Sequence, residues 1–138
     1  VRAVQGYIAH QSANQAGTHA ALLRQLGEGL ASLRAALKEI GRWTDTILAT
    51  YSEFGRRAQE NQSGGTDHGT ASVQFVMGGQ VRGGMAGKAP MLDRLDAGGN
   101  LVFTTDFRAY FGGLVAAAYG KSMGEAFGGN VPLGLSRT

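Results

Sequence analysis

Apolar residues recur every three or four positions between Leu22 and Ile40, and this spacing constrains the fold more than any other feature. The recurring residues are Leu22, Leu23, Leu26, Leu30, Leu33, Leu37 and Ile40. Such spacing places them on one side of a helix of about six turns. Thr18 is a suitable N-cap and Gly41 a suitable end. The pattern predicts a long helix that packs its leucines against the rest of the protein.

Strand-like runs flank this predicted helix. Residues 3–8 precede it, and residues 46–51 follow it after a turn. Strand, helix and strand in this order are typical of a right-handed βαβ unit, in which the two strands are parallel. We therefore expect an α/β fold with a mostly parallel sheet and flanking helices. Residues 72–77 form a further strand-like run, which ends at two glycines.

The second half of the chain predicts one more helix. Thr105 or Asp106 can cap it, apolar residues share one face after Phe107, and Gly120 can end it. Residues 121–138 are rich in glycine, and we expect an irregular tail there. Because no linker divides the chain, we expect residues 1–138 to be a single, partial α/β domain.

Composition excludes some functions. The chain has no cysteine, so neither a disulfide nor a thiolate ligand is available. The net charge of +3 is spread along the chain rather than clustered, which argues against nucleic-acid binding. Its apolar runs are too short to cross a bilayer, so we expect no membrane span. The 23 glycines indicate tight turns and close backbone packing.

The polar residues 52–69 contain most of the candidate ligands. Glu53, Asp67 and His68 lie there, and His10 follows the first predicted strand. Loops after parallel strands converge at one edge of a sheet, so these four side chains can meet. Carboxylate and imidazole groups suit a divalent metal such as zinc, manganese or iron. The alternative is that Asp67 and His68 form a turn with a surface histidine.

Arg56 and Arg57 are candidate anion-binding residues in the same segment. A guanidinium can hold two oxygens of a phosphate or sulfate at once, which makes an ester of either acid a possible substrate. The alternative reading is solvated surface charge.

At these residues the chain resembles a known bacterial family. The resemblance rests on residues 46–57, 60–61, 64–71, 76–84 and 104–108, and extends from about residue 13 to residue 119. That family is sulfatase-like, is similar to the alkaline phosphatase superfamily, contains a domain of unknown function and often carries a twin-arginine export signal. The resemblance implies the C-terminal part of an alkaline-phosphatase-like domain, a metal-dependent phosphate- or sulfate-ester hydrolase, and a periplasmic or exported location.

Two positions depart from the pattern of that family. Phe54 stands where a metal ligand is expected, and Ile8 stands where a carboxylate is expected. Neither side chain can bind a metal, so we favour a binding or structural module that is not catalytic on its own. The alternative is one part of an ester hydrolase. The expected partner is a missing N-terminal half or a second copy of the chain.

Overall fold

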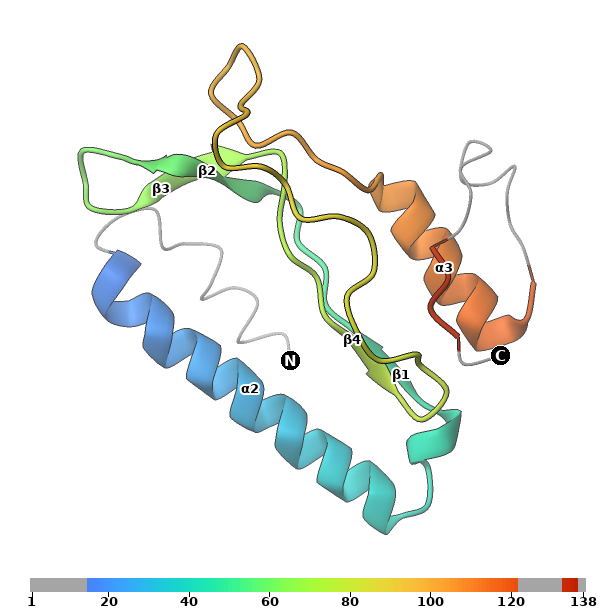
Figure 1. Cartoon of the computed structure of the whole chain (residues 1–138). Helices are drawn as coiled ribbons and strands as arrows, with labels where there is room; N and C mark the ends of the chain where they lie inside the picture. Colours follow the sequence, from blue (N-terminus) through green and yellow to red (C-terminus); the bar gives the residue numbers. More distant parts are fainter. Residues whose placement is uncertain (1–14, 122–132, 137–138) are drawn as a thin grey trace.

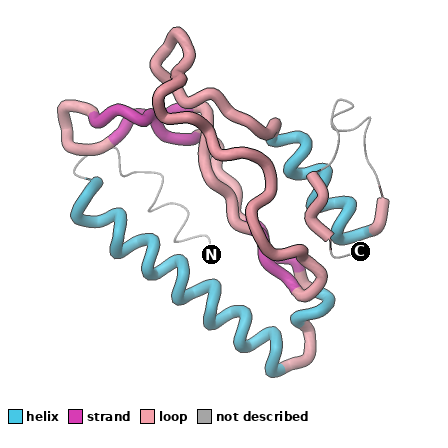
Figure 2. The backbone as a smooth tube through the Cα atoms, viewed as in Figure 1, coloured by secondary structure: helices cyan, strands magenta, loops and turns pink. Residues whose placement is uncertain are grey.

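The fold is that of a computed structural model, which describes residues 15–121 and 133–136. The elements are α2 (Gln15–Glu39), the 3-10 helix η1 (Trp43–Asp45), β1 (Ile47–Ala49), β2 (Gly55–Glu60), β3 (Thr66–Gly69), β4 (Val76–Gly78) and α3 (Phe107–Tyr119). The two long helices lie on opposite sides of a β-ribbon, the two-stranded unit formed by residues 47–78 (Figure 1). Residues 79–106, called the long loop below, are almost entirely irregular (Figure 2).

The leucine pattern correctly predicted the helix α2, but not its packing, because of the seven apolar residues only Leu22 is buried. The helix begins at Gln15, three residues before the expected cap, and ends beside Gly41 as expected. Gly41 adopts a φ of +69°, its N–H donates to the Lys38 carbonyl, and the Arg42 N–H donates to the Leu37 carbonyl. These two bonds form a Schellman motif, which closes the last turn of the helix.

The β-ribbon is antiparallel throughout. Leu48 lies opposite Met77 in the β1–β4 pair, and Gly55 lies opposite Gly69 in the β2–β3 pair. The backbones of the two paired segments approach so closely that a Cβ added at Gly55 would lie 1.8 Å from the Ala71 carbonyl oxygen. Glycine at this position is therefore required by contact between backbones.

The expected parallel sheet is wrong. Every strand pair within residues 15–121 is antiparallel, and these strands form two separate two-stranded sheets. The physical reason is that the chain after β1 reverses direction at the turn between β2 and β3 and returns as β4. Antiparallel strands need only such a turn, whereas parallel strands need a crossover connection. The strand predicted at residues 3–8, on which the βαβ expectation depended, lies outside the described residues.

The segment predicted as a polar loop, residues 52–69, instead contains the β2–β3 hairpin. Its turn is organised by Asn61, whose Oδ1 accepts hydrogen bonds of 3.0 Å from the N–H groups of Ser63 and Gly65. Asparagine, serine and glycine favour such turns because they satisfy the backbone locally or tolerate positive φ. These residues were a signal for a hairpin.

The second predicted helix is confirmed as α3. Asp106 is its N-cap, because the carboxylate accepts a 2.8 Å hydrogen bond from the Arg108 N–H, and Gly120 ends it with a φ of +64°. Hydrogen bonds from the Arg108 side chain, and then from its backbone, lower the pKa of Asp106 to about 2. None of the helices described is long and apolar enough to cross a membrane.

A hydrogen bond from Tyr110 joins α3 to the ribbon. The Tyr110 hydroxyl, on a buried side chain, donates a 2.7 Å hydrogen bond to the Thr50 carbonyl just after β1. On another side of α3 the Leu133 N–H donates to the Ala109 carbonyl at 3.0 Å, and Gly113 leaves room for the Leu133 backbone. Residues 133–136 of the expected irregular tail are thus extended along α3; the rest of that tail beyond Lys121 lies outside the described residues.

Replacing Tyr110 with Phe tests this connection. Loss of the hydroxyl leaves the Thr50 carbonyl without its donor, and we expect the free energy of unfolding to fall by about 1–2 kcal/mol. The matched control is Tyr119→Phe at the exposed end of α3, which should change stability by less than about 0.5 kcal/mol. Urea unfolding followed by circular dichroism measures both. Equal stability of the two variants would show that Tyr110 does not anchor α3.

Candidate functional site

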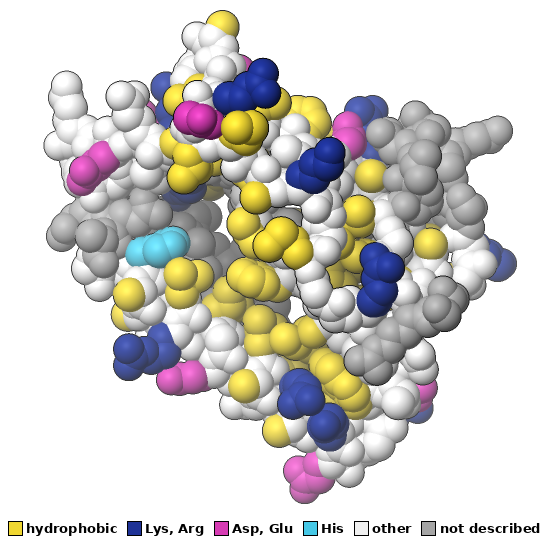
Figure 3. Space-filling model, in the orientation of Figure 1, with side chains coloured by type: hydrophobic (Ala, Val, Ile, Leu, Met, Phe, Trp, Pro, Cys, Tyr) yellow, Lys and Arg dark blue, Asp and Glu magenta, His cyan; other side chains and the backbone are white. Residues whose placement is uncertain are grey.

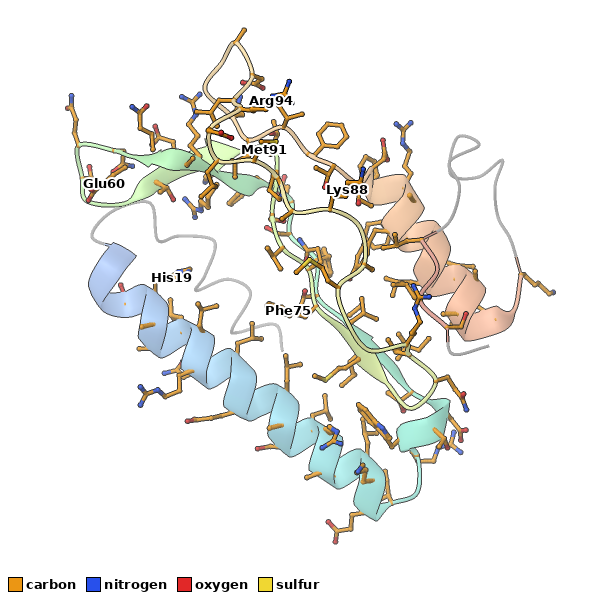
Figure 4. All side chains as sticks on the ribbon, viewed as in Figure 1. His19, Glu60, Phe75, Lys88, Met91 and Arg94 are labelled. Atoms are coloured by element: carbon orange, nitrogen blue, oxygen red, sulfur yellow. The ribbon has the colours of Figure 1, made fainter. Side chains whose placement is uncertain are left out.

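The β2–β3 hairpin carries most of the predicted site residues, and its far end is marked by Glu60 (Figure 4). His68 stacks on Phe54 with ring centroids 3.6 Å apart and an angle of 13° between the rings. Arg56 lies opposite His68 in the register, and its guanidinium carbon lies 5.3 Å from the centroid of the Phe54 ring. Phe54, Arg56 and His68 therefore form one cluster at the start of the hairpin, which we call the Phe54 cluster.

The two arginines predicted to bind an anion contact different parts of the chain. Arg56 donates a 2.8 Å hydrogen bond to the Thr66 carbonyl, within the hairpin. Arg57 is exposed and lies near Asp96 of the long loop. Hydrogen bonds from the backbone and side chain of Asn100, helped by the positive charge of Arg57, lower the pKa of Asp96. The two arginines thus make different contacts among the described residues, and the anion site stays a prediction.

Asp67 and His68, two of the predicted metal ligands, make different contacts. Asp67 and His68 are consecutive residues of β3, and successive strand side chains point to opposite faces. Accordingly, Asp67 accepts a 2.9 Å hydrogen bond from the Asn61 amide, whereas His68 stacks on Phe54. Glu53 is exposed just before β2.

His10, the fourth predicted ligand, lies outside the described residues. Among the residues that are described, no three histidine, aspartate or glutamate side chains gather in a group that could hold a metal. The zinc, manganese or iron site therefore stays a prediction.

Sequence reasoning overlooked two residues that organise this region. Asn61 both shapes the hairpin turn and binds Asp67, and its place before a serine and two glycines was a usable signal. Phe54 was considered only as a residue that replaces an expected metal ligand, although its ring stacks on that of His68. Cross-strand contacts of this kind depend on register, for which the sequence of the hairpin carries little signal.

The long loop is attached to the hairpin and to itself by side-chain hydrogen bonds. The Thr70 hydroxyl donates to the Leu101 carbonyl at 2.6 Å, and the Thr104 hydroxyl donates to the Lys88 carbonyl. Lys88, Met91 and Arg94 all project from this loop (Figure 4). The loop therefore exposes both cationic and apolar side chains.

Comparison with known proteins identifies the family. A family model described as a protein of unknown function (DUF1501) matches residues 4–107, which is more than half of the chain. The chain belongs to the DUF1501 family. No curated protein and no solved structure matches it.

This result corrects the resemblance drawn from the sequence. The match is to DUF1501 alone, and nothing found places the chain among sulfatase-like proteins or in the alkaline phosphatase superfamily. The antiparallel ribbon of this DUF1501 chain is likewise not the mostly parallel sheet that the resemblance implied. Short motifs such as residues 66–69 support a family assignment less well than a match over the greater part of the chain.

The Phe54 cluster can be tested by its contribution to stability. We expect His68→Ala in this DUF1501 chain to lower the free energy of unfolding by about 0.5–1 kcal/mol, because the stacked pair is lost. His68→Phe, which keeps an aromatic ring against Phe54 but offers no ligand atom, should retain stability. Urea unfolding distinguishes them; equal loss in both variants would mean that the imidazole nitrogens, rather than the stacking, stabilise the hairpin.

Proposed function

We propose that this chain is a binding or structural module that associates with another polypeptide and is not catalytic on its own. The observation that carries the proposal is the imbalance between buried and exposed apolar side chains. Within the described residues, five hydrophobic side chains are buried and fourteen large ones are exposed. The buried ones are Leu22, Ala71, Val81, Tyr110 and Leu135.

The exposed apolar side chains occur on every part of the fold. Met85 and Leu92 of the long loop are 85% and 73% exposed, Val73 of the ribbon is 73% exposed, and Leu23 of α2 is 45% exposed. A band of hydrophobic side chains runs along α2, with others over the ribbon and the long loop (Figure 3). Monomeric proteins rarely leave so many apolar side chains in contact with water, and large exposed apolar areas mark sites of association.

The polar residues of the hairpin also support a structural role, because each contacts a neighbouring part of the chain. The Asp67 carboxylate is hydrogen-bonded to Asn61, and the Arg56 guanidinium is hydrogen-bonded to the Thr66 carbonyl. His68 is held against Phe54. Each of these groups stabilises the hairpin through a contact within it, and none needs a substrate to explain its position.

One part of a metal-dependent phosphate- or sulfate-ester hydrolase is the alternative that the sequence analysis left open. It would need Glu53, Asp67 or His68 to act with ligands from elsewhere, such as His10 or residues of a partner. Both hypotheses involve a second polypeptide. It is either an N-terminal half of a larger domain or a second copy of this chain. Metal content and turnover separate them.

Purified chain should contain less than stoichiometric zinc, manganese and iron, and it should not hydrolyse aryl phosphate or aryl sulfate. Metal content is measured by inductively coupled plasma mass spectrometry and turnover by release of the phenol. His68→Ala is the matched control and should behave as the unaltered chain does. A stoichiometric metal together with turnover that is lost in His68→Ala would overturn the proposal.

A further inference from the structure

A short segment near the end of the described residues lies along α3 (Figure 1). This segment, residues 133–136, is called the strap below. It pairs with the start of the long loop, where Ser136 forms an antiparallel bridge with Val81 and the Arg82 N–H donates a 2.8 Å hydrogen bond to the Leu135 carbonyl. The strap is thus held by main-chain pairing, in the way that an extended peptide adds to a strand edge.

α3 receives the strap at a position where the helix contains a glycine. The Leu133 N–H donates a 3.0 Å hydrogen bond to the Ala109 carbonyl, and a Cβ added at Gly113 would lie 2.3 Å from the Leu133 carbonyl oxygen. Glycine inside a helix lowers its stability relative to alanine. The close approach of the strap backbone explains this glycine, because a side chain at the same position would collide with it.

Leu135 is the apolar anchor of the strap. Its side chain is 6% exposed, the lowest value among the five buried hydrophobic side chains. Val81, which bridges to the strap, and Tyr110 of α3 are buried as well. Three of these five side chains therefore lie in the strap or in the two segments that it contacts. The strap occupies a site that offers both main-chain partners and a buried place for one leucine.

We infer that α3 and residues 81–82 form a recognition site for an extended peptide, with the strap as the occupant that the chain itself supplies. The inference rests on the proposed function and describes how this chain binds another polypeptide. The strap carries leucines at positions 133 and 135, which the alternation of an extended chain places on one face. An extended segment of a partner with two leucines in this spacing takes the place of the strap.

Covalent attachment gives the strap an advantage over a segment of another chain. A segment joined to its site by a short connection meets that site at an effective concentration on the order of millimolar. The strap itself has few contacts, chiefly the hydrogen bonds with Arg82 and Ala109 and the burial of Leu135. A partner therefore displaces it only at a comparable effective concentration, or when these contacts are weakened. This competition makes the strap a device that limits association.

Leu135→Asp in the full chain tests the inference, because a carboxylate is disfavoured at a buried position and the strap is released. The probe is a fluorescently labelled peptide of residues 131–138. Fluorescence anisotropy should show saturable binding of the peptide to Leu135→Asp, and binding at least tenfold weaker to the unaltered chain, whose strap occupies the site. The same peptide carrying Leu135→Asp is the matched control and should not bind.

Leu135→Ala serves if the aspartate variant does not fold, because a smaller side chain weakens the strap without burying a charge. Adding Gly113→Ala to either variant should abolish binding of the peptide, since the new Cβ occupies the place of its backbone. Gly27→Ala in α2 is the control for this second change. An added Cβ there meets no other atom within 4 Å, so binding should be unaltered.

The inference is overturned if the peptide does not bind to a folded strap variant, or if it binds the unaltered chain equally well. Equal binding of the control peptide, or of the chain with Gly113→Ala, would also overturn it. Any of these results would make the strap a fixed part of the fold. They leave the metal and turnover measurements untouched, so this inference and the proposed function can fail separately.

Discussion

The antiparallel pairing of β1 with β4 is the constraint on which the rest of the structure depends. It places Thr50 at the end of the ladder, where its carbonyl accepts the Tyr110 hydroxyl and so positions α3. It also brings the chain back along itself, so that Gly55 and Gly69 meet where only glycine fits. From the same register follows the direction of every backbone group at the outer edge of β1.

Strand alternation has an equally direct effect on chemistry. Asp67 and His68 are neighbours in sequence, yet β3 directs one towards Asn61 and the other towards Phe54. The two side chains thus make different contacts, and the metal site predicted at them stays a prediction. Meanwhile the apolar side chains that would fill a core lie exposed on α2, the ribbon and the long loop. Both features favour association over catalysis by the chain alone.

The two helices could be predicted from the sequence because their signals are local. Leucine spacing and Gly41 define α2, while Asp106 and Gly120 define α3. The ribbon could be predicted only in part. Residues 46–51 and 72–77 were recognised as strand-like, but the partner of each strand depends on contacts between distant residues, and a helix beside β1 favoured the wrong topology. The contacts of Asp67 and His68 could not be predicted for the same reason, since the faces of β3 follow from register; the metal site itself stays a prediction.

The central claim is that this chain associates with another polypeptide through the apolar side chains that α2, the ribbon and the long loop leave exposed. Sedimentation velocity of the purified chain over a wide range of protein concentration tests it most directly. The account predicts species larger than one chain as the concentration rises. A single chain at every concentration, together with a stoichiometric metal and turnover, would contradict the claim.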